Sequence, residues 1–109
     1  MPSSYEPGEV ARRLTADDVA LALVDVRDRE EWRNAHVEGA LHLPLDELDQ
    51  RADELPRDRA LAFICRTGKR SETAAERAAP QGLDAGNVTG GMEAWAAAGL
   101  PVRHGDAAA

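Results

Sequence analysis

The chain has 109 residues, a length that allows one domain. Its formal net charge of −7 and its pI of about 4.9 argue against nucleic acids and anionic membranes as partners. No run approaches the roughly 18 apolar residues of a membrane span, and residues 1–8 lack the segments of a signal peptide, so we expect a cytoplasmic protein. A single cysteine excludes an internal disulfide and a metal site built on several thiolates, and we expect no metal and no cofactor.

The N-terminal stretch is predicted to contain only short elements. Residues 1–8 are rich in Pro, Ser and Gly, which predicts a loose lead-in, and residues 9–14 are expected to form a short edge strand. Thr15 is followed by acidic residues, as at a helix N-cap, so we expect a short helix that ends near Ala20.

The middle of the chain predicts a central strand and an amphipathic helix. Residues 21–26 form a nearly continuous apolar run, as expected of a buried parallel strand. A helical turn over residues 29–34 is expected to place Trp32 in the core. A short strand at residues 41–44 then leads into leucines at helical spacing over residues 45–55.

A strand, a turn and a helix surround the only cysteine. The apolar run that starts at Ala60 ends at Cys65, a loop with one glycine and three cations follows, and residues 72–79 have a good helix sequence. A last strand at residues 87–89 and a helix at residues 92–98 complete the pattern.

Strands that alternate with helices indicate an α/β domain around a central, mostly parallel sheet of about five strands, with helices on both faces. We place this domain at residues 9–102, followed by a flexible tail at residues 103–109. Cys65 then lies at the carboxyl edge of the sheet, where open α/β sheets bind their ligands.

The loop after Cys65 is suited to hold a thiolate. The first amides of a helix have no partner inside the helix and carry partial positive charge. Gly68 allows the loop to curl so that these amides face inward, and nearby cations favour the same ionised form. We therefore expect the pKa of the Cys65 thiol to lie below the free value of about 8.5.

Four segments carry motifs in a recognisable order. They are Asp-Val-Arg at residues 25–27, Glu-Trp with His-Val-Glu-Gly-Ala within residues 31–40, the Cys-Arg-Thr-Gly-Lys-Arg-Ser loop at residues 65–71, and Gly-Gly-Met-Glu-Ala-Trp at residues 90–95. Together they resemble the rhodanese (sulfurtransferase) family, and the likeness runs from about Glu9 to Val102. Ala35 stands where the family usually has glycine, which would destabilise a turn that needs a positive φ.

The resemblance implies a single rhodanese-like domain and a sulfurtransferase of the thiosulfate type. Cys65, the catalytic residue, would attack a small sulfur-containing anion such as thiosulfate and become a persulfide. With no second cysteine, the sulfur would pass to an external acceptor, either cyanide or a thiol, and a protein acceptor stays open. The residues expected to bind the substrate are Arg66, Thr67, Gly68, Lys69 and Arg70. The residues expected to support the loop, the first two through hydrogen bonds to its backbone, are Asp25, Arg27 and Ser71.

Other functions compete with this interpretation. A non-enzymatic persulfide carrier, redox sensor or binding module of the same family stays open, since an exposed thiolate of low pKa is readily oxidised. A loop of the tyrosine-phosphatase type is disfavoured because Arg70 closes the loop one position early. A Cys–His acyl enzyme is disfavoured because His36 belongs to a turn that resembles the family's and His104 lies in the tail.

Overall fold

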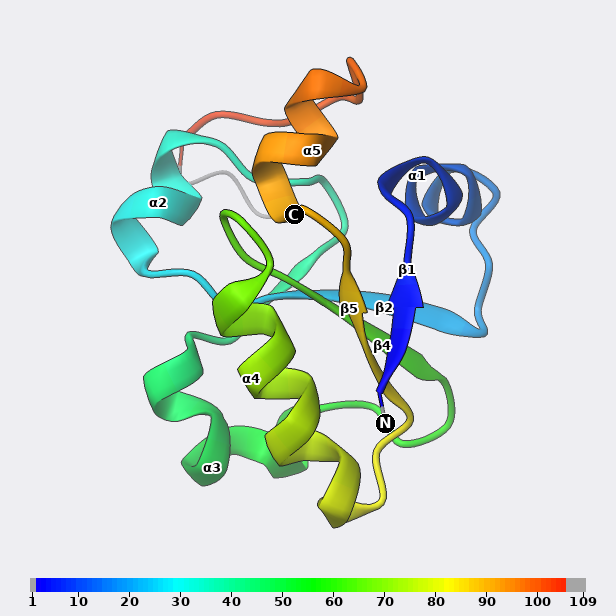
Figure 1. Ribbon diagram of the computed structural model, residues 1–109, viewed down its shortest axis with the longest axis vertical. Helices are drawn as coiled ribbons and strands as arrows, with labels where there is room; N and C mark the ends of the chain where they lie inside the picture. Colours follow the sequence, from blue (N-terminus) through cyan, green and yellow to red (C-terminus); the bar gives the residue numbers. More distant parts are fainter. Residues whose placement is uncertain (1, 106–109) are drawn as a thin grey trace.

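The computed structural model, which describes residues 2–105, contains a sheet of five parallel strands in the order β1-β5-β4-β2-β3 (Figure 1). The strands are β1 Ser3–Tyr5, β2 Leu21–Asp25, β3 Leu41–His42, β4 Ala60–Ile64 and β5 Ala85–Val88. β2 and β4 pair along their full lengths in the centre of the sheet, and most of their side chains are buried. Apolar strands of this kind need cover on both faces of the sheet.

Helices provide that cover and create two cores (Figure 1). The helices are α1 Pro7–Thr15, α2 Arg29–Asn34, α3 Leu48–Arg51, α4 Lys69–Ala78 and α5 Gly91–Ala97. Side chains of β4 alternate between the two cores: Phe63 packs with α3 and α4, whereas Ile64 packs with α1 and α5. Trp95 of α5 fills much of the second core and is 1% exposed. The predicted α/β class with a parallel sheet is confirmed.

The first helix lies where the sequence analysis placed a strand. Because α1 begins at Pro7 and ends at Thr15, the edge strand predicted at residues 9–14 and the helix predicted at residues 15–20 are both wrong. Proline in the first turn, Glu9 close behind it and arginines in the last turn all favour a helix here.

The acids after Thr15 close a turn instead of starting a helix. Asp17 has a φ of +54°, which ends the helical path. Asp18 accepts hydrogen bonds from Arg13 Nε at 2.7 Å and from the amide of Ala20 at 2.9 Å. The same carboxylate chemistry that caps helix starts also stabilises turns, and this ambiguity caused the error.

The expected loose lead-in is largely ordered. Residues 3–5 form β1, which pairs in parallel with β5 at the edge of the sheet. Gly86 permits the approach, since a Cβ there would lie 2.5 Å from Tyr5 Cε2. The predicted domain start at Glu9 therefore falls inside α1.

Two further segments differ from the prediction in detail. The helix expected over residues 45–55 is irregular, with α3 as a short α-helix between two 3₁₀ turns. The expected tail is held at its start, because Arg103 and His36 exchange backbone hydrogen bonds of 2.7 and 2.8 Å. Residues 106–109 of that tail lie outside the described residues.

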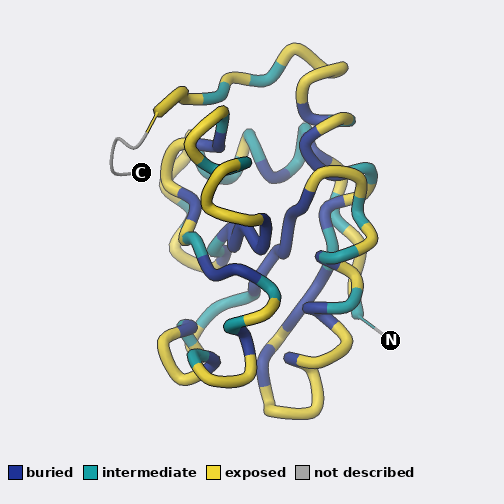
Figure 2. Tube along the Cα trace, turned by 90° about the vertical axis from the view of Figure 1, so that its left-hand side faces the viewer, coloured by how far each residue is buried: buried dark blue, intermediate teal, exposed yellow. Residues whose placement is uncertain are grey.

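Figure 2 shows that buried stretches of the chain run through the interior of the molecule, whereas many of its outer bends are exposed. Among the described residues, no helix is both long enough and apolar enough to span a bilayer. The carboxyl ends of β2, β4 and β5 lie together because these strands are parallel neighbours. The segments that leave those ends build the candidate site.

Candidate active site

The cysteine loop turns tightly between β4 and α4. Cys65 directly follows β4, and α4 begins at Lys69, earlier than the sequence analysis expected, so Ser71 lies in its first turn. Gly68 precedes the helix with a φ of +106°, a backbone conformation that residues with a Cβ rarely adopt. This glycine allows the chain to reverse so that the start of α4 faces the sulfur.

Hydrogen-bond donors converge on the Cys65 sulfur. The amide of Gly68 donates to Sγ at 3.1 Å and the hydroxyl of Ser71 donates at 3.2 Å. The backbone amides of Ser71 and Thr67 also favour the charged sulfur. Burial, which leaves the residue only 1% exposed, raises the pKa of the Cys65 thiol, but these donors outweigh burial and hold the pKa below its ordinary value. The residue is therefore prepared to act as a thiolate.

Asn87 supports the loop and was missed by the sequence analysis. Its Oδ1 accepts from the Ser71 hydroxyl at 2.5 Å, and its Nδ2 donates to the carbonyl of Gly68 at 3.2 Å. In the register of the sheet Asn87 lies opposite Phe63, two residues before the cysteine. The sequence did contain one indication of this role: Asn87 is the only amide side chain in β5, the strand next to the one that leads into Cys65.

The N-terminus of α5 holds the other side of the loop. The amides of Met92 and Glu93 donate to the carbonyls of Cys65 and Arg66 at 2.7 and 3.0 Å. Gly91 permits this contact: a Cβ there would clash with the Cys65 carbonyl oxygen and would lie 2.7 Å from the backbone of Arg66. The loop thus turns its amides toward the sulfur and its carbonyls toward α5.

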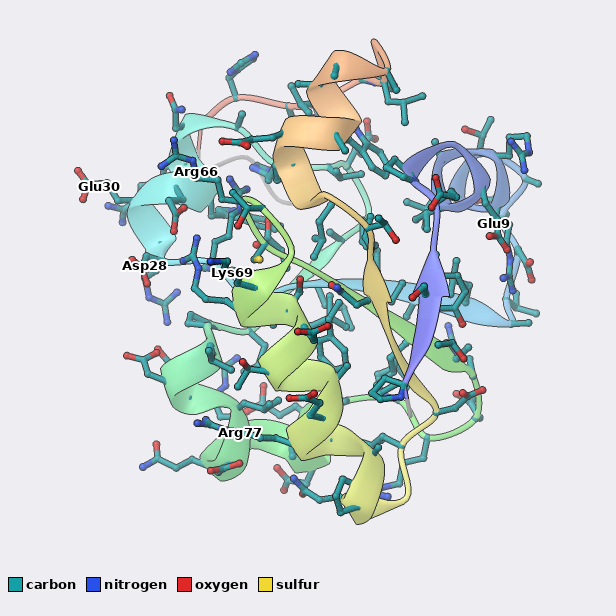
Figure 3. The ribbon with its side chains drawn as sticks, in the orientation of Figure 1. Glu9, Asp28, Glu30, Arg66, Lys69 and Arg77 are labelled. Carbon is teal, nitrogen blue, oxygen red and sulfur yellow. The ribbon has the colours of Figure 1, made fainter. Side chains whose placement is uncertain are left out.

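Two of the three expected cations are paired with carboxylates. Arg70 binds both carboxylate oxygens of Glu31 at 2.7 and 2.9 Å, and Arg66 Nε lies 3.2 Å from a carboxylate oxygen of Glu93. Lys69 is exposed and forms no ion pair within residues 2–105. The contact of Arg70 with Glu31 joins the start of α4, where Figure 3 labels Lys69, to α2. The loop is therefore less positive than its own sequence suggests.

Asp25 and Arg27 lie at the expected sheet edge, but their hydrogen bonds go elsewhere. The two side chains form a buried pair with N–O distances of 2.8 to 3.1 Å, and Arg27 also donates to the carbonyl of Ala35 at 2.6 Å. The expected bonds to the cysteine loop are absent among the described residues, so the pair stabilises the segment after α2 instead. Ala35 itself has a φ of −163°, so alanine causes no backbone strain there.

The histidines are bonded away from the sulfur. His36 donates through Nδ1 to the carbonyl of Trp32, and His42 donates through Nε2 to the carbonyl of Arg27, each at 2.8 Å. Trp32, expected in the core, is partly buried and stacks with both of these rings at centroid distances of 3.8 and 4.7 Å. His104 bonds to the carbonyl of Asn34. None of the three histidines forms a nucleophile–base pair with Cys65.

A metal site or a cleft next to Cys65 would add further groups to the candidate site. Within residues 2–105, no three metal-ligating side chains of His, Cys, Asp or Glu come together. A cleft of about 400 Å³ lies between α1 and α5 and includes Trp95 and Val37, but no residue of the cysteine loop lines it. The candidate site is therefore confined to Cys65 and the groups around it.

Known proteins are similar to this chain in sequence and in fold. The family model of the rhodanese-like domain matches residues 6–98. A sulfurtransferase from Allochromatium vinosum is 35% identical over 103 residues, which covers 94% of this chain and 95% of that protein. A Bacillus subtilis protein provisionally named a sulfur carrier is 39% identical over 88 residues, which covers 80% of this chain but 48% of that protein, so the chain spans about half the length of that relative. The crystal structure of a rhodanese-related protein from Thermoplasma volcanium has a TM-score of 0.85 at 29% identity and covers 93% of this chain and 97% of its own.

Proposed function

Because this chain belongs to the rhodanese-like family of sulfurtransferases and sulfur carriers, we propose that it transfers sulfane sulfur through a persulfide on Cys65. The observation that carries the proposal is the set of donors around this sulfur, namely the amide of Gly68 at 3.1 Å and the hydroxyl of Ser71 at 3.2 Å. These donors favour the thiolate, which is the form of cysteine that attacks sulfur.

The first step is attack on the donor. The Cys65 thiolate forms a bond to the sulfane sulfur, and the bond between that sulfur and the rest of the donor breaks. With thiosulfate the leaving group is sulfite, which takes the bonding electron pair. The product is Cys65–S–S⁻, whose charge the loop amides can solvate as they solvate the thiolate.

The second step needs a nucleophile from outside the chain. The chain contains one cysteine, so no internal thiol can displace the outer sulfur. An external thiol or cyanide attacks that sulfur, the S–S bond breaks, and the Cys65 thiolate returns with the electron pair. A protein thiol is a further acceptor in this proposal.

The donor in the proposal is a small sulfur-containing anion such as thiosulfate. Gly68 and Thr67 offer backbone amides at the loop, and Lys69 offers an exposed ammonium group without an ion-pair partner among the described residues. Arg66 and Arg70 can reach an anion only by leaving or sharing their carboxylate partners.

The test is an intact-mass measurement after incubation with thiosulfate. We expect a gain of one sulfur atom that disappears when cyanide is added. Cys65→Ser should keep its circular dichroism spectrum and show no gain, because the swap is nearly isosteric and the fold depends on the apolar strands. A wild-type protein that gains no sulfur, or a Cys65→Ser variant that still does, would contradict the proposal.

Persulfide carriage is the second candidate function, and the Bacillus subtilis relative provisionally named a sulfur carrier favours it. A carrier and an enzyme differ in turnover. A carrier releases its sulfur to one acceptor and reloads slowly, whereas an enzyme forms thiocyanate continuously from thiosulfate and cyanide. Thiocyanate formed in large molar excess over the protein would identify the enzyme.

A further inference from the structure

We infer that Glu31 determines which sulfur donors the site accepts: by holding Arg70 it disfavours doubly charged donors such as thiosulfate and favours donors with a single negative charge. The inference rests on the proposed function and narrows its substrate class. Glu31 lies on α2, far from the cysteine loop in sequence, and the sequence of the loop does not indicate that Glu31 contacts it.

The contact between Glu31 and Arg70 is well defined. Two guanidinium nitrogens of Arg70 bind the two carboxylate oxygens of Glu31, and the same carboxylate accepts the amide of Asp28 at 3.1 Å. The Arg70 and Glu31 side chains are 34% and 30% exposed, so the pair is partly shielded from water. Parallel bonds of this kind are stronger than single contacts and fix the arginine plane.

The charge of Glu31 is present at every pH at which the protein would work. The hydrogen bonds from Arg70 lower the pKa of Glu31 to about 2. Arg70 also lies close enough to Cys65 for its charge to interact with the thiolate. Glu31 therefore reduces the positive charge that an arriving donor meets beside the sulfur.

The neighbouring pair of Arg66 and Glu93 provides a natural contrast. It has one contact of 3.2 Å, and its side chains are 68% and 58% exposed. An exposed ion pair with a single contact contributes little to stability, and water readily replaces the contact. Arg66 can therefore turn toward a bound anion freely, whereas Arg70 cannot do so without disrupting its contact with Glu31.

Sulfur donors with one and with two negative charges should therefore interact differently with the cations of the loop. The exposed ammonium of Lys69 can balance one negative charge without disturbing any ion pair in the described part of the chain. Arg70 is the arginine whose charge interacts with the Cys65 sulfur, and Glu31 already neutralises it. A dianion loses about twice as much attraction through this neutralisation as a monoanion, because the Coulomb energy is proportional to charge. Methanethiosulfonate, CH₃SO₂–S⁻, carries one charge and transfers the same kind of sulfur as thiosulfate. Its reaction with the Cys65 thiolate forms the persulfide and releases methanesulfinate with the electron pair.

The experiment measures kcat/KM for thiosulfate and for methanethiosulfonate, with cyanide as acceptor, in the wild type, Glu31→Gln and Glu93→Gln. Glutamine keeps one acceptor oxygen for the Asp28 amide and one Arg70 nitrogen, and it removes the charge together with the acceptor of the second Arg70 bond. We expect Glu31→Gln to raise kcat/KM for thiosulfate about three- to tenfold, mainly through KM, and to change methanethiosulfonate by less than about twofold. Glu93→Gln should change both donors by less than about twofold.

Salt and a conservative variant separate charge from structure. The gain for thiosulfate in Glu31→Gln should shrink as ionic strength rises, because screening weakens charge contacts. Glu31→Asp, which keeps the charge, should not show the gain. Equal changes for both donors, or a loss of thiosulfate use in Glu31→Gln, would overturn the inference while leaving the proposed function intact. A wild type that transfers sulfur from neither donor would overturn both.

Discussion

At the scale of single residues, the Ser71 hydroxyl links the protonation of the thiol to the rest of the site. It has one proton and two acceptors in reach, the Cys65 sulfur at 3.2 Å and Asn87 Oδ1 at 2.5 Å. A neutral thiol leaves that proton with Asn87, whereas a thiolate attracts it. Ser71 can therefore stabilise the charged sulfur by turning its hydroxyl proton from Asn87 to the sulfur.

Ser71→Ala should raise the pKa of the Cys65 thiol, because one of the donors that favours the thiolate is lost. The rate of alkylation by iodoacetamide, measured against pH, reports this pKa as its midpoint. Thr73→Ala is the matched control, since its hydroxyl lies on the same helix and bonds to the carbonyl of Lys69 instead. A midpoint that is the same in Ser71→Ala and the wild type would show that the hydroxyl does not stabilise the thiolate.

At the scale of elements, the shape of the loop depends on the close approach of α5. The first amides of α5 bind the carbonyls of Cys65 and Arg66, and Gly91 has no side chain that would prevent it. The helix replaces the hydrogen bonds that water would otherwise make to these carbonyls. The loop amides can then remain oriented toward the sulfur.

Gly91→Ala should destabilise the protein by about 2–4 kcal/mol, because a Cβ at a φ of +59° would clash with the loop backbone. Gly99→Ala is the control, with a φ of +72° and no atom within 4 Å of the added Cβ, and should cost only about 1 kcal/mol. Urea unfolding measures both values. Thiol alkylation should also slow in Gly91→Ala alone, and an equal effect of the two substitutions would mean that contact with the loop is unimportant.

At the scale of the whole molecule, three separate segments meet at one loop. α2 contributes Glu31, β5 contributes Asn87 and α5 contributes the amides of Met92 and Glu93. The parallel sheet brings them together because the carboxyl ends of neighbouring strands share one edge. The stability of the fold and the geometry of the site are therefore coupled.

The Glu31–Arg70 contact should make stability depend on pH in acid. Because folding lowers the pKa of Glu31 from 4.5 to about 2, the folded state gains stability above the ordinary value and loses it as the pH falls toward 2. The stability difference between the wild type and Glu31→Gln, measured by urea unfolding, should therefore decrease from about pH 6 to about pH 3. In an Arg70→Met background the same comparison should show a much smaller change with pH. A difference that stays constant with pH in the wild-type background would contradict this account.

Local sequence was sufficient to predict the centre of the fold but not its edges. The short apolar runs before Asp25 and Cys65 favour buried strands, and both strands were predicted correctly. β1 has three residues and little apolar character, so only its pairing with β5 makes it a strand. The pairing of β1 with β5 cannot be predicted from the residues of β1 alone, because strand formation depends on the neighbouring strand.

The same limit applies to the candidate site. The positions of Cys65, Gly68 and the helix that follows them could be predicted, because these features depend on residues adjacent in the sequence. The partner of Arg70 lies 39 residues away, so the sequence of the loop alone gives no sign that Arg70 is paired. Its pairing changes the expected preference for donors, which shows that local charge alone does not establish specificity.

The loop separates two tasks between its backbone and its side chains. The amides of Thr67 and Gly68 face the sulfur, while the side chains of Arg66, Thr67 and Lys69 are exposed. An amide is the same whichever side chain its residue carries. Mutation can therefore exchange these outer side chains over evolutionary time without changing the groups that stabilise the thiolate. If Cys65 acts as proposed, duplicated genes can in this way diverge in sulfur donor and acceptor while the groups around the sulfur stay the same.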